Sequence, residues 1–102
     1  MNLEDCREQI DIIDKELVEL FVKRMDIAKN VAQYKKENDL PVLDAARERS
    51  LLEKVEALSG EEYGDYTRRL YGSILELSKA HQNKTLAPRS DLSNKIKNAV
   101  KN

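Results

Sequence analysis

Two cationic side chains stand on the apolar stripe of a helix that the heptad spacing predicts over residues 3–37. Arg24 occupies the position between Leu20 and Ile27, where the pattern requires an aliphatic side chain. Lys35 closes the same stripe. Eleven residues separate the two cations, so Lys35 returns to within roughly 20° of the face of Arg24, about 16 Å further along the helix. Two long cationic side chains at this spacing would leave a slot for a small anion.

Arg24 also has a purely structural interpretation. A charged residue in a heptad pattern can form a buried ion pair or fix the register of a coiled coil. That interpretation leaves the matching position of Lys35 unexplained.

Arg7 is a third cation of the same predicted helix, about 25 Å from Arg24 along a straight axis. It cannot reach the same pocket within one chain, so any role in such a site requires a second subunit. The length of the helix agrees with this, because about 50 Å exceeds the span of a compact domain of this size. Its apolar stripe must be covered by later helices, by a second subunit, or by both.

Two carboxylates lie on the apolar stripe of the next predicted helix, where side chains should face the protein core. Extending its apolar stripe backwards from Leu51 at helical spacing gives Glu48 and then Asp44. Asp44 is equally well explained as an N-cap residue. Glu48 is not, because the glutamate of a capping box would stand at position 47, which is Arg47.

A third group of polar residues lies late in the chain. Tyr71, Ser78 and Gln82 share one helical face, with Ser78 and Gln82 one turn apart. Taken alone, such residues are commonly just exposed, and His81 is interpreted as a surface residue. The sequence has no zinc-type Cys/His cluster, no glycine-rich phosphate loop and no serine elbow.

The elements that must position these residues are three helices of unequal length. The first is predicted over Leu3–Glu37, because no Gly or Pro interrupts it, and it should end in the Asn, Asp and Pro of residues 38–41. The second runs from near residue 44 to residues 59–60, and the third covers about residues 62–83. Residues 84–102 carry five basic residues against one acid and are expected to form a tail, poorly ordered or weakly helical, or a linker remnant.

Composition limits the class of protein. The chain has 102 residues, enough for one domain, and 36% charged against 5% aromatic residues, which favours solvated helices. A net charge of −1 with both signs interleaved gives no field for nucleic acid or an anionic membrane. No segment has the apolar length of a membrane span or a signal peptide. The single Cys6 is expected to be a buried apolar residue in a reducing compartment, so a cytoplasmic protein is predicted.

With these residues in view, the chain resembles the all-helical, type II chorismate mutases over roughly residues 3–83. The residues that carry the resemblance are dispersed: Arg7 in DCREQIDIID, Arg24 in LFVKRMDIA, Lys35 in AQYKK, Asp44, Arg47 and Glu48 in PVLDAARER, and Ser78 and Gln82 in SKAHQ. The resemblance implies an intertwined homodimer in which two long first helices pair. Family members occur alone or fused to other enzymes of aromatic biosynthesis, and the tail has no counterpart in the minimal fold.

The reaction implied by the resemblance is the Claisen rearrangement of chorismate to prephenate, a step toward phenylalanine and tyrosine, with no cofactor. Guanidinium groups are suited to binding carboxylates, so the resemblance implies that Arg24 and Arg7 of the partner subunit bind the two carboxylates of the substrate. Arg47 would help to hold the site together. Lys35 and Gln82 would donate to the ether oxygen as it gains negative charge.

The remaining residues complete the implied site. Glu48 would accept a hydrogen bond from the ring hydroxyl with Asp44 nearby, and Ser78 would contact a carboxylate. Two other functions stay open: an isochorismate pyruvate-lyase of the same fold, in which the carboxylate at Glu48 is not expected, and a non-catalytic dimerisation module in which Arg24 fixes helix register.

Overall fold

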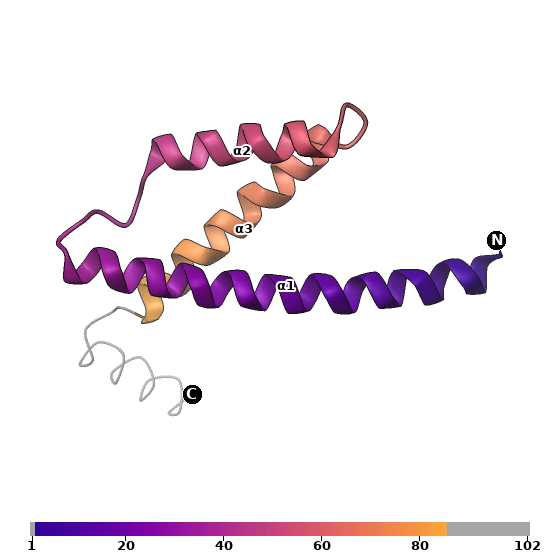
Figure 1. Cartoon of the computed structure of the whole chain (residues 1–102), viewed down its shortest axis with the longest axis horizontal. Coiled ribbons are helices and arrows are strands. Elements are labelled where there is room, and N and C mark those ends of the chain that lie inside the picture. The colour runs from indigo at the N-terminus through magenta and orange to yellow at the C-terminus, as the bar shows by residue number, and fades with distance from the viewer. Residues whose placement is uncertain (1, 86–102) are drawn as a thin grey trace, which may run out of the picture.

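The computed structural model of the chain describes residues 2–85, which form three α-helices (Figure 1). They are α1 (Leu3–Glu37), α2 (Ala45–Ser59) and α3 (Gly64–Thr85), so the all-helical prediction is confirmed. The third helix begins and ends two residues later than predicted, because a turn occupies residues 61–63 before it. Residues 84 and 85 therefore belong to α3, and the rest of the predicted tail lies outside the described residues.

Side chains cap both ends of α1. At the N-terminus, Oδ1 of Asn2 accepts a hydrogen bond of 2.8 Å from the backbone N–H of Asp5. At the C-terminus, Nδ2 of Asn38 donates to the carbonyl of Tyr34 at 2.8 Å, and Asp39 takes a left-handed conformation with φ of 55°. The predicted stop in residues 38–41 is thus made by asparagine and aspartate, the residues that tolerate this geometry.

A tight connection brings α3 back against α2. Gly60 ends α2 with φ of 82°, a conformation that side chains disfavour. Gly64 begins α3 so close to α2 that an added Cβ would lie 3.1 Å from the backbone oxygen of Glu56. An ion pair of 3.0 Å between Arg68 and Glu56 also joins the two helices. The hairpin depends on these small residues at its turn.

The helices enclose a very small core. α3 packs along α2 and crosses the C-terminal half of α1, while the N-terminal half of α1 extends past both (Figure 1). Among residues 2–85, only Ala32 and Val55 are buried apolar residues, and Ser78 is the buried polar one. The described chain is elongated, with extents of 55, 37 and 20 Å. One copy therefore does not bury the apolar surface that its sequence supplies.

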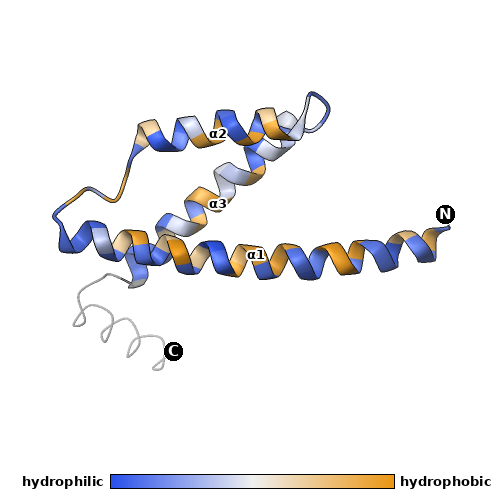
Figure 2. Cartoon of the chain, viewed as in Figure 1, coloured by the Kyte–Doolittle hydropathy of each residue, from blue (hydrophilic) through white to orange (hydrophobic). Residues whose placement is uncertain are grey.

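The apolar stripe of α1 is largely exposed. Leu17, Leu20 and Ile27 are 55%, 61% and 62% exposed, and Cys6, predicted to be buried, is only half-buried. Figure 2 shows apolar residues interleaved with polar ones along the whole helix. No helix within the described range is long and apolar enough to cross a membrane. The prediction that α1 cannot bury its stripe alone is confirmed.

Candidate active site

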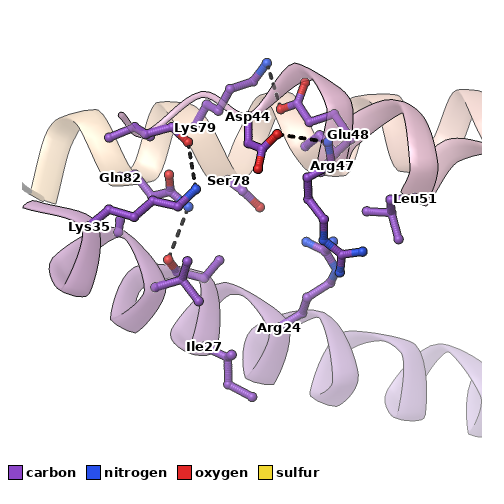
Figure 3. A pocket seen from close by; sticks show the side chains of 15 residues that line it. Arg24, Ile27, Lys35, Asp44, Arg47, Glu48, Leu51, Ser78, Lys79 and Gln82 are labelled. Atoms are coloured by element: carbon purple, nitrogen blue, oxygen red, sulfur yellow. Dashed lines mark hydrogen bonds and ion pairs between the residues drawn. The ribbon is translucent and has the colours of Figure 1, made fainter. Parts of the chain in front are cut away.

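A cavity of about 330 Å³ lies where α1, the start of α2 and the end of α3 come together (Figure 3). Its apolar wall is formed by Ile27, Ala28, Val31, Ala32, Val42, Leu51 and Leu75. Its polar wall is formed by Arg24, Lys35, Asp44, Arg47, Glu48, Ser78, Lys79 and Gln82. Helical spacing explains this convergence, because each helix turns one stripe of its residues toward the same space.

The cavity unites the residues that the sequence analysis predicts for the site, with one exception. The predicted site residues on all three helices line it, apart from Arg7. Arg7 is exposed on the part of α1 that extends past α2 and α3. The expectation that Arg7 does not serve the pocket of its own chain agrees with this position.

Arg24 is half-buried beside an aromatic ring. Its guanidinium carbon lies 5.7 Å from the centroid of Tyr71, a cation–π geometry. No carboxylate within residues 2–85 forms an ion pair with this guanidinium, so the described chain supplies no buried ion pair for Arg24. Figure 3 shows the side chains of Arg24 and Arg47 extending toward one another. Two guanidinium groups that face each other make a site for an anion.

Lys35 and Gln82 approach the cavity from opposite helices, each anchored by a backbone carbonyl (Figure 3). The Lys35 ammonium donates to the carbonyl of Val42 at 3.1 Å, and the Gln82 amide donates to the carbonyl of Ala28 at 3.2 Å. An ammonium has three N–H donors and a primary amide has two. Both side chains therefore keep donors for a ligand while the anchoring bonds fix their positions.

Two of the predicted site residues also stabilise the fold. Oδ1 of Asp44 accepts a hydrogen bond of 3.0 Å from the backbone N–H of Arg47, so the N-cap interpretation is confirmed although Asp44 also lines the cavity. Ser78 is 5% exposed, and its hydroxyl donates to the thioether sulfur of Met25 at 3.4 Å. A thioether is a weak acceptor, so the hydroxyl can turn toward a better one.

Lys79 is a wall residue that sequence reasoning missed. Its ammonium lies 3.3 Å from Oε1 of Glu48 and 3.1 Å from Oε1 of Glu76. These two carboxylates, Glu76 first, raise the pKa of Lys79 above its ordinary value of 10.5. The one available signal was its spacing of three residues before Gln82, which places both on neighbouring turns of one face.

Charge and shape together describe what the cavity can hold. Four cations and two carboxylates line its described wall, an excess of two positive charges. Ser78 and Gln82 complete the polar wall, the rest of the described lining is apolar, and neither Cys nor His contributes to it. The cavity is thus suited to a small dianion with an apolar body, held by guanidinium and ammonium donors.

Comparison with known proteins decides the family. Residues 6–83, which include all three helices almost completely, match chorismate mutase type II. This chain belongs to the type II chorismate mutase family. The all-helical fold that the resemblance implies is therefore the fold of this chain over the matched residues.

Relatives of this chorismate mutase domain include fused and single proteins. The bifunctional chorismate mutase/prephenate dehydratase of Buchnera aphidicola subsp. Schizaphis graminum is 38% identical over 82 residues, covering 78% of this chain and 21% of the relative. A protein of the same name from Aquifex aeolicus is 37% identical over 62 residues, covering 61% of this chain and 17% of the relative. The chorismate mutase of Methanocaldococcus jannaschii is 29% identical over 86 residues, covering 82% of this chain and 87% of the relative. The chain spans about a fifth of the length of the first bifunctional relative. No solved structure was matched.

Proposed function

We propose that this domain catalyses the rearrangement of chorismate to prephenate in a cavity that a second copy of the chain completes. The observation that carries the proposal is the convergence of Arg24, Lys35, Glu48 and Gln82, from three helices, on one cavity in a chain of this family. The relative from Methanocaldococcus jannaschii, most of which is matched, is named a chorismate mutase, which supports the same function.

Arg24 grips one substrate carboxylate, and Arg7 of the partner subunit grips the other. Guanidinium groups form two parallel hydrogen bonds to a carboxylate, and each such charged hydrogen bond contributes about 1.5–3 kcal/mol. The excess of positive charge on the described cavity wall, to which Arg7 of the partner subunit would add, suits the two carboxylates of chorismate. Arg47 faces Arg24 across the cavity and holds the anion site together.

Lys35 and Gln82 donate hydrogen bonds to the ether oxygen of the bond that breaks. As the ether bond of the substrate lengthens, its oxygen gains negative charge, and a positioned donor stabilises that charge more in the transition state than in the ground state. One donor of this kind contributes roughly 3–4 kcal/mol in other enzymes. The anchoring bonds to Val42 and Ala28 support this role, because they position both side chains before the substrate arrives.

Glu48 accepts a hydrogen bond from the ring hydroxyl, with Asp44 close to the same hydroxyl and Ser78 in contact with a carboxylate. No bond forms between substrate and protein in this reaction, so the polar wall has only to bind and to stabilise charge. The apolar wall, with Val31, Leu51 and Leu75 among its residues, restricts rotation of the ether in its reactive conformation.

The exposed stripe of α1 supports the proposal of a second subunit. A homodimer in which two α1 helices pair would bury residues such as Leu17 and Leu20, which are more than half exposed in one copy. A twofold axis gives both copies the same contacts, so each Arg7 would reach the cavity of the other chain. The separation of about 25 Å between Arg7 and Arg24 supports this arrangement, because an Arg7 that takes part in a site would have to serve the cavity of the other chain.

A substrate assay tests the function directly. The purified chain is expected to consume chorismate and form prephenate, and to release no pyruvate from isochorismate. Arg24→Met should abolish the turnover, whereas Lys29→Met, an exposed cation of α1 that does not line the cavity, should retain it. Pyruvate release from isochorismate, or chorismate turnover that survives Arg24→Met, contradicts the proposal.

A further inference from the structure

Lys79 lines the cavity but has no part in the reaction described above. Its ammonium lies between two carboxylates: Oε1 of Glu48 at 3.3 Å on α2, and Oε1 of Glu76 at 3.1 Å one turn earlier on α3. The side chains of Lys79 and Glu48 are 29% and 26% exposed, whereas Glu76 is 76% exposed. The pair with Glu48 is therefore the better shielded of the two and the one that faces the cavity.

We propose that Lys79 is a positioning residue, which holds the Glu48 carboxylate in the orientation that receives the substrate hydroxyl and away from the cavity arginines. The inference rests on the proposed function, since it specifies how one residue of that site is kept ready.

A carboxylate has two oxygens, and Lys79 engages one of them. Oε1 of Glu48 lies 3.3 Å from the ammonium, and among residues 2–85 no other cation forms an ion pair with this carboxylate. Figure 3 shows the Glu48 carboxylate turned toward Lys79. One oxygen is thus fixed by the protein while the other stays available to accept from a ligand.

The alternative positions of Glu48 explain why it has to be held. Five other charged groups share the cavity wall with Glu48: Arg24 and Lys35 of α1, Asp44 at the N-cap of α2, Arg47 of α2, and Lys79 of α3. Glu76 does not line the cavity but forms an ion pair with Lys79. Glu has a flexible side chain, and a carboxylate released from Lys79 would be attracted to the guanidinium groups. It would then occupy the place of a substrate carboxylate. Lys79 prevents this self-inhibition by offering Glu48 a cation at another point of the wall.

Glu76 helps to keep Lys79 positively charged. The carboxylates of Glu76 and Glu48 raise the pKa of Lys79 above 10.5, so the ammonium stays protonated throughout the neutral range.

A double-mutant cycle tests the inference in the full chain. Lys79→Met should lower kcat/KM for chorismate by about tenfold, mainly by raising KM, because the hydroxyl contact and the free arginines bind substrate and transition state alike. In a Glu48→Gln background the same change should cost less than about twofold, since a neutral amide is not drawn to the arginines. Lys79→Arg, which keeps the positive charge, should have a KM close to that of the wild-type chain.

Two controls separate the possible failures. Lys54→Met makes the same substitution at an exposed position of α2 outside the cavity, and it should leave kcat and KM unchanged. An equal loss of kcat/KM from Lys79→Met with and without Glu48, or a lower melting temperature with unchanged KM, overturns the positioning role while the wild-type turnover still supports the proposed function. A wild-type chain that does not turn over chorismate overturns both.

Discussion

The guanidinium carbon of Arg24 lies 5.7 Å from the centroid of the Tyr71 ring, a contact that links the C-terminal half of α1 to α3. A ring face attracts a cation without forming hydrogen bonds with its N–H groups. Arg24 is therefore oriented by Tyr71 and still has its donors available for an anion. A carboxylate in place of the ring would have oriented the arginine equally well but would have neutralised it.

Arg24→Lys tests whether the geometry of the guanidinium matters beyond its charge. Lysine keeps the positive charge but cannot form two parallel hydrogen bonds to a carboxylate. Loss of one charged hydrogen bond predicts a rise in the KM for chorismate of about ten- to a hundredfold. Steady-state kinetics measure it, and an unchanged KM would show that Arg24 acts only as a point charge.

Lys35→Ala separates transition-state stabilisation from binding. The bond from the Lys35 ammonium to the ether oxygen strengthens as charge develops, so kcat should fall more than KM rises. The matched control is Lys29→Ala, an exposed lysine of the same helix outside the cavity. If only KM changes in Lys35→Ala, Lys35 is a plain binding residue.

Gln82→Glu should make the activity depend on pH. The amide of Gln82 donates at any pH, whereas a glutamate donates only when protonated, and its ordinary pKa is about 4.3. Activity of the variant is expected under acidic conditions and should be lost as the pH rises through the pKa of the new carboxyl group. The wild-type chain should remain active across neutral pH. Identical pH–rate profiles for the two proteins would show that Gln82 does not donate a hydrogen bond to the ether oxygen.

Two variants of Asp44 separate its role as the N-cap of α2 from its proposed role in the activity. Asp44→Ala removes the acceptor for the backbone N–H of Arg47 and should lower the free energy of unfolding by about 1 kcal/mol as well as the activity. Asp44→Asn keeps a side-chain oxygen for the cap, so the stability should be preserved while the activity falls with the lost charge. Thermal unfolding and chorismate kinetics on both variants check this. Full activity in Asp44→Asn would leave Asp44 with the structural role alone.

Several residues that line the cavity could be predicted from the sequence, because helical periodicity fixes the face on which each one lies. Arg24 and Lys35 on α1 and Glu48 on α2 depart from apolar stripes, and each stripe turns toward the same cavity. The ends of α1 and α2 followed from the same local chemistry, since the breaker residues at 38–41 and 59–60 ended these helices as expected, whereas α3 begins and ends two residues later than predicted.

Contacts between helices could not be predicted in this way. The pairing of Lys79 with Glu48 joins residues on different helices, and no period within one helix encodes it. The bond from Gln82 to the carbonyl of Ala28 depends likewise on how α3 crosses α1. The bond from Lys35 to the carbonyl of Val42 depends on the path of the connection between α1 and α2. Periodicity gives the direction of a side chain along its own helix, whereas its partner depends on tertiary packing.

Complementation between two inactive variants tests the shared site most directly. Arg7→Ala and Arg24→Met should each abolish turnover as homodimers, because each removes one carboxylate grip from both cavities. After unfolding and refolding of an equal mixture, a mixed dimer holds one cavity with both arginines intact. Recovery of about a quarter of the wild-type activity is expected, since half of the dimers are mixed and each mixed dimer has one intact site of two. Full activity in Arg7→Ala alone, or no recovery from a mixture shown to contain mixed dimers, would contradict it.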